Sequence, residues 1–343
     1  PGNGPFVSAD AARDFVRHLG KKHGLEIDPD SRVRDLAVGI RQRLEILKAL
    51  SRQARILVLD EPTAVLTPQE RDSLFAAMRH LAAQGMALVL VTHKIPEVVA
   101  VTDRITVMRD GRLSGTLITR ETSEAEIIRA MIGRNVPPTV APKMTPTAEP
   151  MLSVRNLSVR KGDIAVVDNV SFDVRPGEIV GIAGVSGNGQ PQLISAVTGL
   201  EAATGEVVVA GRDVSGLSIA QRRSAGISYV PEDRHLTGTA PAASIAENIV
   251  FGRHRGAAAS KRGFLRKEAI RAQARRLIEQ FRVKAASEQV PVGSLSGGNM
   301  QKVVIAREIE HGAPLIVIEE PTRGVDVGAI EFIHKTLIAE RDK

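Results

Sequence analysis

The sequence contains a long internal repeat, and this repeat limits the fold more than any other feature. Residues 36–43, LAVGIRQR, precede residues 56–63, ILVLDEPT, and residues 295–302, LSGGNMQK, precede residues 315–322, LIVIEEPT. The two pairs align without a gap at an offset of 259 residues. Because self-similarity at a fixed spacing indicates repeated structural units, the sequence predicts one type of domain that occurs twice.

Composition fits two domains without disulfides. The 343 residues are 43% hydrophobic and 25% charged, enough for about two cores, and the absence of cysteine excludes disulfides and thiolate metal sites. No N-terminal stretch resembles a signal peptide and no apolar run is long enough to span a membrane, so a reducing cytoplasm is expected. Although the net charge is +7, aromatic residues are only 3%, which argues against a nucleic-acid partner and favours a solvated basic surface.

The repeat also predicts the domain boundaries. Residues 135–150, with five prolines, read as a linker between a first domain at 1–134 and a second at 151–343. By the offset, the first-copy counterpart of the loop at 184 would precede Pro1, and that of His93 would lie near position 352 in the second copy. The chain is therefore expected to hold the second half of one domain and most of the next.

Local patterns predict α/β cores with a mostly parallel sheet and antiparallel and helical additions. The expected strands are 56–59, 87–92, 152–159, 164–174 and 178–183, the expected helices are 65–84, 192–200 and 267–281, and a hairpin is expected at 105–112. The strand at 178–183 would lead directly into a glycine loop.

That loop, GVSGNGQP at 184–191, has the spacing of a phosphate-binding loop without its chemical residues. Gly184 and Gly189 fit G-x-x-x-x-G-K-[ST], but Gln190 stands in place of the lysine and Pro191 in place of the hydroxyl. Proline is tolerated there because the first turn of a helix has no use for that N–H. The frame of the loop is present and the groups that would hold phosphate and magnesium are not.

Two carboxylates follow the strand at 56–59. At this position Asp60 can hold Mg²⁺ and Glu61 can orient and deprotonate a water. His93, 32 residues after Glu61, is then a candidate sensor of a γ-phosphate. The alternatives are a strand that simply ends in acidic turn residues and an ordinary surface histidine.

The stretch LSGGN at 295–299 is expected to open a helix, so that its backbone N–H groups and serine hydroxyl can face an anion. Taken alone it could be a glycine turn with a serine cap. Glu319 and Glu320, at the spacing seen in the first copy, strengthen the anion-binding interpretation.

Together these motifs resemble the ATP-binding cassette (ABC) family over essentially the whole chain. The resemblance implies a P-loop NTPase fold, ATP and Mg²⁺ as cofactors, and catalytic roles for Glu61, His93 and Glu320, with Asp60 and Glu319 on the metal. It implies nucleotide contacts from Gly184, Gly187, Asn188, Gly189, Gln190, Ser296, Gly297, Gly298, Asn299 and, at the Q-loop position, Glu232.

In this family two cassettes meet head to tail, and each ATP lies between the P-loop of one and the signature of the other. One composite site would combine Asp60, Glu61 and His93 with Ser296 to Gly298. The other would combine the 184 loop and Glu320 with Leu36 to Gly39, where alanine and valine replace the serine and one glycine. The resemblance thus implies one competent site and one degenerate site.

Within the family, GNGQ at 187–190, PEDR at 231–234 and PTRGVDVG at 321–328 are similar to bacterial importers of simple sugars and nucleosides. Residues 36–50 and 62–70 are most similar to the nucleoside branch, with the pentose branch as the alternative. This implies separate transmembrane permease subunits, an extracytoplasmic solute-binding protein and a peripheral place on the cytoplasmic face of the membrane. Residues 236–248 would contact the permeases. A soluble tandem ATPase of the translation or DNA-repair type is the alternative.

Overall fold

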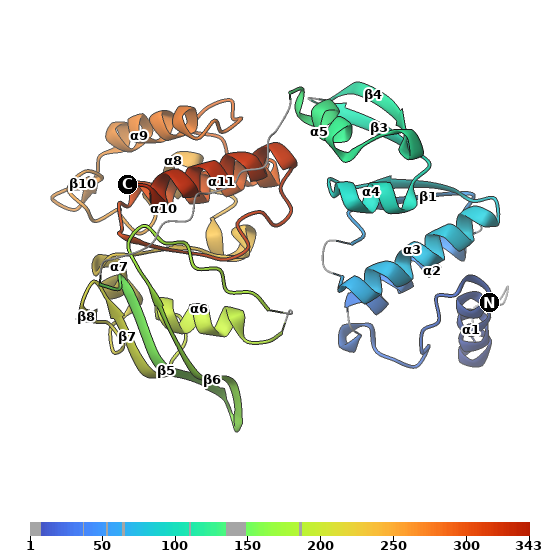
Figure 1. The fold of residues 1–343 in the computed structure, drawn as a ribbon, viewed down its shortest axis with the longest axis horizontal. Helices are drawn as coiled ribbons and strands as arrows, with labels where there is room; N and C mark the ends of the chain where they lie inside the picture. The colour runs from blue at the N-terminus through green and yellow to red at the C-terminus, as the bar shows by residue number, and fades with distance from the viewer. Residues whose placement is uncertain are drawn as a thin grey trace. The chain divides into compact units, whose positions relative to one another are not determined.

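The computed structural model describes residues 8–36, 38–52, 54–63, 66–109, 111–134, 149–184 and 187–343. The chain divides between Pro137 and Pro138 into two compact units, and this division falls inside the predicted linker. Most of that linker, 135–148, lies outside the described residues, as does Ala37. Each unit is therefore considered by itself (Figure 1).

Unit 1 contains a parallel strand pair, an antiparallel hairpin and the helices around them. Its elements are α1 (Ala9–His23), η1 (Val33–Asp35), α2 (Val38–Leu50), β1 (Ile56–Asp60), α3 (Pro68–Ala83), β2 (Ala87–Val91), α4 (Ile95–Val101), β3 (Arg104–Arg109), β4 (Arg112–Ile118), η2 (Thr119–Glu121) and α5 (Glu124–Ile132). β1 and β2 are parallel neighbours, and the core between α2, α3 and β1 includes Ile46, Leu57, Leu59, Phe75 and Leu81.

Unit 2 combines a four-stranded antiparallel sheet, a parallel strand pair and a helical layer. Its elements are β5 (Leu152–Lys161), β6 (Ile164–Val174), α6 (Gln190–Thr198), β7 (Thr204–Val209), β8 (Arg212–Asp213), α7 (Ile219–Ser224), β9 (Ile227–Val230), η3 (Arg234–Gly238), α8 (Ile245–Val250), β10 (Ser260–Lys261), β11 (Phe264–Leu265), α9 (Lys267–Gln280), η4 (Val292–Ser294), α10 (Gly297–Glu310), β12 (Leu315–Ile318) and α11 (Val327–Arg341). The long strands β5 and β6 run side by side, in the order β6-β5-β7-β8, and β9 pairs in parallel with β12 (Figure 1).

The repeat predicted from sequence is visible in equivalent contacts. Thr67 caps α3 by accepting from the Glu70 amide, and Asp326 caps α11 by accepting from the Ala329 amide at 2.9 Å. Gly39 lies against Glu70 in unit 1, and Gly298 lies against Ala329 in unit 2. Since all three pairs of positions differ by 259, the helix after the acidic strand starts in the same way in both copies.

Most predicted elements are confirmed, and two expectations are wrong. The predicted helix at 65–84 begins only at Pro68, because Thr67 and Glu70 form a capping box there. Residues 178–183 form irregular backbone instead of a strand, and Ile179, Val180 and Ile182 of this stretch are exposed. A strand needs a hydrogen-bonded neighbour, and in the described part of unit 2 the strands β9 and β12 pair with each other.

The first-copy strands are half buried instead of fully buried. Leu57 and Leu59 of β1 face the core, while Ile56 and Val58 are 65% and 61% exposed. This alternation arises because side chains point to opposite faces of a strand and, among the described residues, only one face of the β1–β2 pair is covered.

Candidate functional site

The carboxyl end of β1 carries the first acidic pair. Asp60 is the last residue of the strand, is exposed, and pairs with Val91 of β2. Glu61 follows with a φ of 43°, which is left-handed and costs a residue with a side chain roughly 1 kcal/mol. Its amide still donates to the Val91 carbonyl at 2.9 Å. The chain therefore turns at Glu61 without losing the strand pairing.

This turn brings the Glu61 carboxylate onto His93, a residue that the sequence analysis had assigned to the same site. Glu61 Oε1 accepts from the His93 amide at 3.1 Å and lies 2.7 Å from His93 Nδ1. Because an ionised carboxylate only accepts hydrogen bonds, Nδ1 carries the proton in this contact. The second oxygen, Oε2, is buried without a hydrogen-bond partner in the described part of the chain. One oxygen is thus held and the other is left to accept a proton.

These residues fit a magnesium ion that takes its remaining ligands from phosphate and water. Asp60 supplies an exposed carboxylate for the ion, and the next residue, Glu61, keeps Oε2 unpartnered for a proton. Within the described residues there is no group of three or more His, Asp or Glu that could hold a metal by itself. Two carboxylates beside a phosphate group are the pattern that Mg²⁺ prefers over an all-protein cage.

A buried polar contact that sequence reasoning missed supports this pair. Glu97 of α4 is 5% exposed and accepts from the Thr63 hydroxyl at 2.5 Å. Lys94 lies 3.3 Å from the Glu97 carboxylate and donates to the Thr63 carbonyl at 3.1 Å. The turn after Glu61 is thereby joined to the helix after His93. No local motif signals this contact, because its partners are 34 residues apart.

The second acidic pair keeps the backbone turn but differs in its surroundings. Glu320 has a φ of 40°, close to that of Glu61, and is exposed. Glu319 accepts from the Tyr229 hydroxyl at 3.2 Å and from the Glu232 amide at 3.3 Å, and burial raises the pKa of the Glu319 carboxyl. Both Glu319 oxygens are engaged by the protein. Glu319 therefore fits the predicted metal-binding role less well than Asp60.

The described residues of the glycine loop, Gly184 and 187–191, include two glycines with positive φ and a glutamine side chain that lies against Gly184. Gly187 and Gly189 have φ of 94° and 93°, and a Cβ at Gly189 would collide with the Val166 carbonyl. Asn188 between them is exposed. The Gln190 amide lies against Gly184, where lysine would otherwise reach phosphate. α6 begins at Gln190 with Pro191 in its first turn, as expected.

The LSGGN stretch opens α10, as the sequence predicted. Ser296 is the exposed N-cap residue, and its hydroxyl accepts from the side-chain Nδ2 of Asn299 at 2.9 Å instead of capping a backbone N–H of the helix. Gly297 has no room for a side chain, since a Cβ would come within 2.6 Å of Arg234 Nη2 and 3.0 Å of the Gly324 carbonyl. In the first copy, Val38 stands at the position equivalent to Gly297.

Glu232 belongs to a network that links three of these motifs. Its carboxylate forms an ion pair with Arg323, in the loop after Glu320. Arg234 donates to the carbonyls of Arg323 and Gly324 at 2.6 Å and 3.1 Å. Sequence analysis identified Glu232 but not the two arginines. The structure thus brings together the Q-loop position, the loop after the acidic pair and the start of α10 within unit 2.

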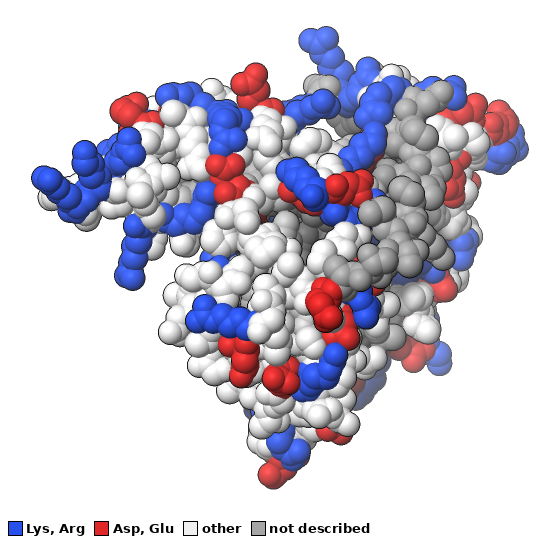
Figure 2. Space-filling model, turned by 60° about the vertical axis from the view of Figure 1, so that its left-hand side comes forward, with Lys and Arg blue, Asp and Glu red and all other residues white. Residues whose placement is uncertain are grey.

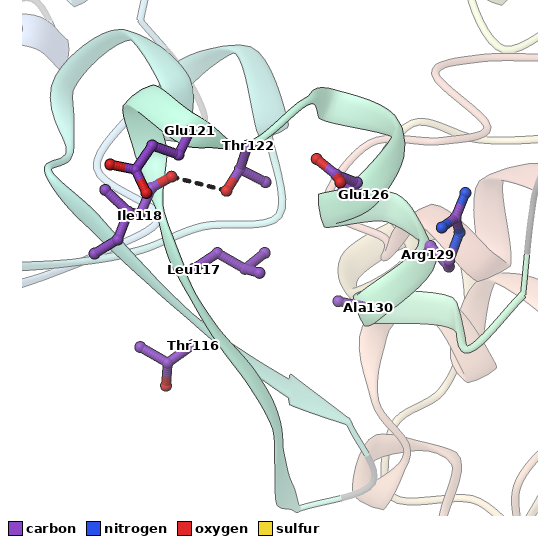
Figure 3. Close-up of a pocket in the computed structure, with 8 residues that line it drawn as sticks. All are labelled: Thr116, Leu117, Ile118, Glu121, Thr122, Glu126, Arg129 and Ala130. Atoms are coloured by element: carbon purple, nitrogen blue, oxygen red, sulfur yellow. Dashed lines mark hydrogen bonds between the residues drawn. The ribbon is translucent and has the colours of Figure 1, made fainter.

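A hollow in unit 1 is unrelated to these residues. It has a volume of about 460 Å³, opens widely to solvent between β4, η2 and α5, and is lined by side chains such as Leu117, Glu126 and Arg129 (Figure 3). The Thr122 hydroxyl closes one side by donating to the Ile118 carbonyl at 2.7 Å. None of the predicted nucleotide or metal residues lines it.

The fold and these motifs together define a nucleotide-binding cassette protein. The family model described as "ABC transporter" matches residues 7–64 and 167–323, and the chain belongs to this family. The P-loop NTPase fold class expected from sequence is thereby confirmed. No helix in the described ranges is long and apolar enough to cross a membrane.

Three relatives have similar sequences. The chain is 41% identical to the nucleoside import ATP-binding protein NupA of Lactococcus lactis subsp. cremoris, over 97% of this chain and 66% of that protein. It is 40% identical to the guanosine import ATP-binding protein NupO of Bacillus subtilis, over 98% of this chain and 66% of that protein. It is 42% identical to the glucose import ATP-binding protein TsgD13 of Haloferax volcanii, over 98% of this chain and 62% of that protein. The chain therefore spans slightly less than two-thirds of the length of these relatives.

Proposed function

We propose that the complete protein is the ATP-binding subunit of a bacterial ABC importer for a nucleoside or simple sugar. It would contain two cassettes, represented here by 1–134 and 151–343, and would work at the cytoplasmic face of the membrane through separate permease subunits and a solute-binding protein. The family membership and the import ATP-binding relatives support this proposal. The observation that carries it is the Glu61–His93 contact at 2.7 Å, which assembles a general base and its orienting partner.

We further infer that the two nucleotide sites are unequal. In the first, Glu61 Oε1 is fixed by His93, and Oε2 would take the proton of an attacking water. Bound ATP would supply the phosphate bond that is cleaved. Asp60 would hold the Mg²⁺ ion that accompanies it. Ser296 and the two glycines after it would close this site from the second copy, because their amides lie at the start of α10.

The second site lacks the groups that the first retains. Gln190 supplies no positive charge, Pro191 supplies no hydroxyl, and the Glu319 oxygens are already engaged by Tyr229 and the Glu232 amide. Each missing preorganised contact typically lowers the rate on the order of 10² or more. This site would hold nucleotide weakly or without turnover.

The decisive experiment measures ATP hydrolysis by the complete chain reconstituted with its permeases. Glu61→Gln should lower the rate by about 10² or more, because the general base is lost, whereas Glu320→Gln should leave most of it. The two variants are a matched pair, since both residues occupy the same left-handed backbone position. Loss of activity in Glu320→Gln alone would reverse the assignment of the two sites. Co-purification with ribosomes instead of permeases would favour the soluble tandem ATPase.

A further inference from the structure

A short hairpin in unit 2 presents two large apolar side chains to solvent. β10 and β11 pair Ser260 with Leu265 and Lys261 with Phe264. Phe264 is 81% exposed and Leu265 is 51% exposed. The base of the hairpin is firmly held, because Ala259 is buried in the core with α8 and α9 and its carbonyl accepts from the Arg266 amide at 2.8 Å. The apolar tip therefore stands on a fixed support.

The hairpin lies in a strongly basic stretch. Between Glu247 and Glu268 there is no acidic residue, while six are basic. Arg253 turns inward and donates to the Glu310 carbonyl at 2.9 Å. The other five are exposed: Arg255, Lys261, Arg262, Arg266 and Lys267. Figure 2 shows that, over much of the face it draws, basic and acidic side chains are interspersed.

Three of these cations have no compensating partner. In the described part of the chain, Arg255, Lys261 and Arg262 form neither an ion pair nor a side-chain hydrogen bond. Arg262 and Gly263 form the turn, with φ of 51° and 85°. This turn favours asparagine or glycine at both positions, so an arginine at the first one is conformationally costly. The hairpin holds a charge at its tip despite that cost.

We propose that the β10–β11 hairpin docks on an anionic lipid surface, with Phe264 and Leu265 between the headgroups and the surrounding cations on their phosphates. Apolar side chains beside Lys and Arg are the chemistry of an interfacial anchor, since the rings enter the headgroup layer and the charged ends stay with the phosphates. A nucleic acid fits less well, because the hairpin has one aromatic ring and no second stacking surface on it. The proposal rests on the proposed function, which places the protein at a membrane.

The absence of tryptophan from the chain allows a site-specific test. Phe264→Trp places the one tryptophan at the tip, and Met108→Trp places it at another exposed hairpin position, 67% accessible in unit 1. Each variant is mixed with vesicles of phosphatidylglycerol and phosphatidylcholine, or of phosphatidylcholine alone. Tryptophan emission should shift to the blue only for Phe264→Trp and only with phosphatidylglycerol. Neither nucleotide nor permease is needed, so the result is independent of the ATPase experiment.

Charge-matched variants measure the contribution of the cations. Each Lys or Arg near an anionic surface strengthens binding roughly fivefold, so Lys261→Gln with Arg262→Gln should weaken vesicle co-sedimentation about 25-fold. The control removes the same charge from the exposed end of α1, as Lys21→Gln with Lys22→Gln, and should have much less effect. Equal weakening by both pairs would show that only net charge matters and would overturn the proposal. So would an unshifted Phe264→Trp emission, or variants that lose permease binding but keep vesicle binding.

Discussion

Arg234 is expected to stabilise unit 2 through the loop that follows the second acidic pair. Its side chain is half-buried, and its guanidinium donates to the carbonyls of Arg323 and Gly324. Burial lowers the pKa of Arg234, but an arginine stays protonated, so both donors remain charged. Arg234→Ala removes both hydrogen bonds and leaves space beside Gly297.

The size of the effect follows from the type of contact. A hydrogen bond from a charged donor contributes about 1.5–3 kcal/mol net, and partial exposure places these two at the lower end. Burying the guanidinium removes it from water, and this desolvation cost offsets part of the stabilisation from the two hydrogen bonds. Arg234→Ala should therefore lower the free energy of unfolding by about 2 kcal/mol. Arg234→Met, which keeps most of the volume but no donor, separates the hydrogen bonds from packing.

Urea unfolding can be followed by fluorescence of Tyr229, the one tyrosine of the chain, in β9 of the same unit. The control is Arg271→Ala, which removes an exposed pair with Glu268 and should cost less than about 0.5 kcal/mol. If Arg234→Ala shifts the midpoint no more than Arg271→Ala, the link does not stabilise this unit. If Arg234→Met is as stable as the native protein, packing alone accounts for the effect.

Three further changes test other parts of the structure. Glu308 is 2% exposed and forms an ion pair with Arg307. Glu308→Ala should lower the free energy of unfolding by about 3–5 kcal/mol, because a buried charge loses its partner. A loss below about 1 kcal/mol in the same urea assay would contradict this. Gly189→Ala should destabilise unit 2 more than Gly187→Ala, since both have positive φ but only the former Cβ meets a carbonyl; equal melting temperatures would refute the clash. Burial, and after it nearby positive charge, lowers the pKa of His23 below 6.5, so the folded state binds fewer protons than the unfolded state. The free energy of unfolding of unit 1 should therefore fall as the pH drops below about 6.5. Amide exchange in α1 measures this fall, and the trend should be absent in His23→Gln.

Local patterns were sufficient where the determining residues are close in sequence. The helix predicted at 267–281 is found at Lys267–Gln280, because its apolar spacing puts Ile270, Ala274 and Leu277 on one buried face. The hairpin predicted at 105–112 is confirmed by the pairing of Arg109 with Arg112. Likewise, α10 starts at Gly297, directly after the predicted serine cap.

Features that depend on distant residues could not be predicted in this way. The stretch 178–183 has a strand composition, but a strand forms only beside a partner that its own sequence does not specify. The same holds within the site. Motif spacing placed Glu61 and His93 in one site, whereas the Thr63–Glu97 and Arg234–Gly324 hydrogen bonds join residues 34 and 90 positions apart whose pairing no motif specifies. Only packing brings such pairs together.

Glu61 and Glu320 share a left-handed backbone turn, which bears on how readily nucleotide binding could be restored in the second copy. Altered side chains can be exchanged one by one, whereas a lost backbone geometry requires many coordinated changes. In the second copy the turn at Glu320 and the positive φ of Gly187 and Gly189 are intact, and Gln190 and Pro191 lie in a helix that starts at Gln190. We therefore expect Gln190→Lys together with Pro191→Ser to fit the existing backbone of the second copy. A gain in nucleotide affinity would show that these two side chains were the missing groups.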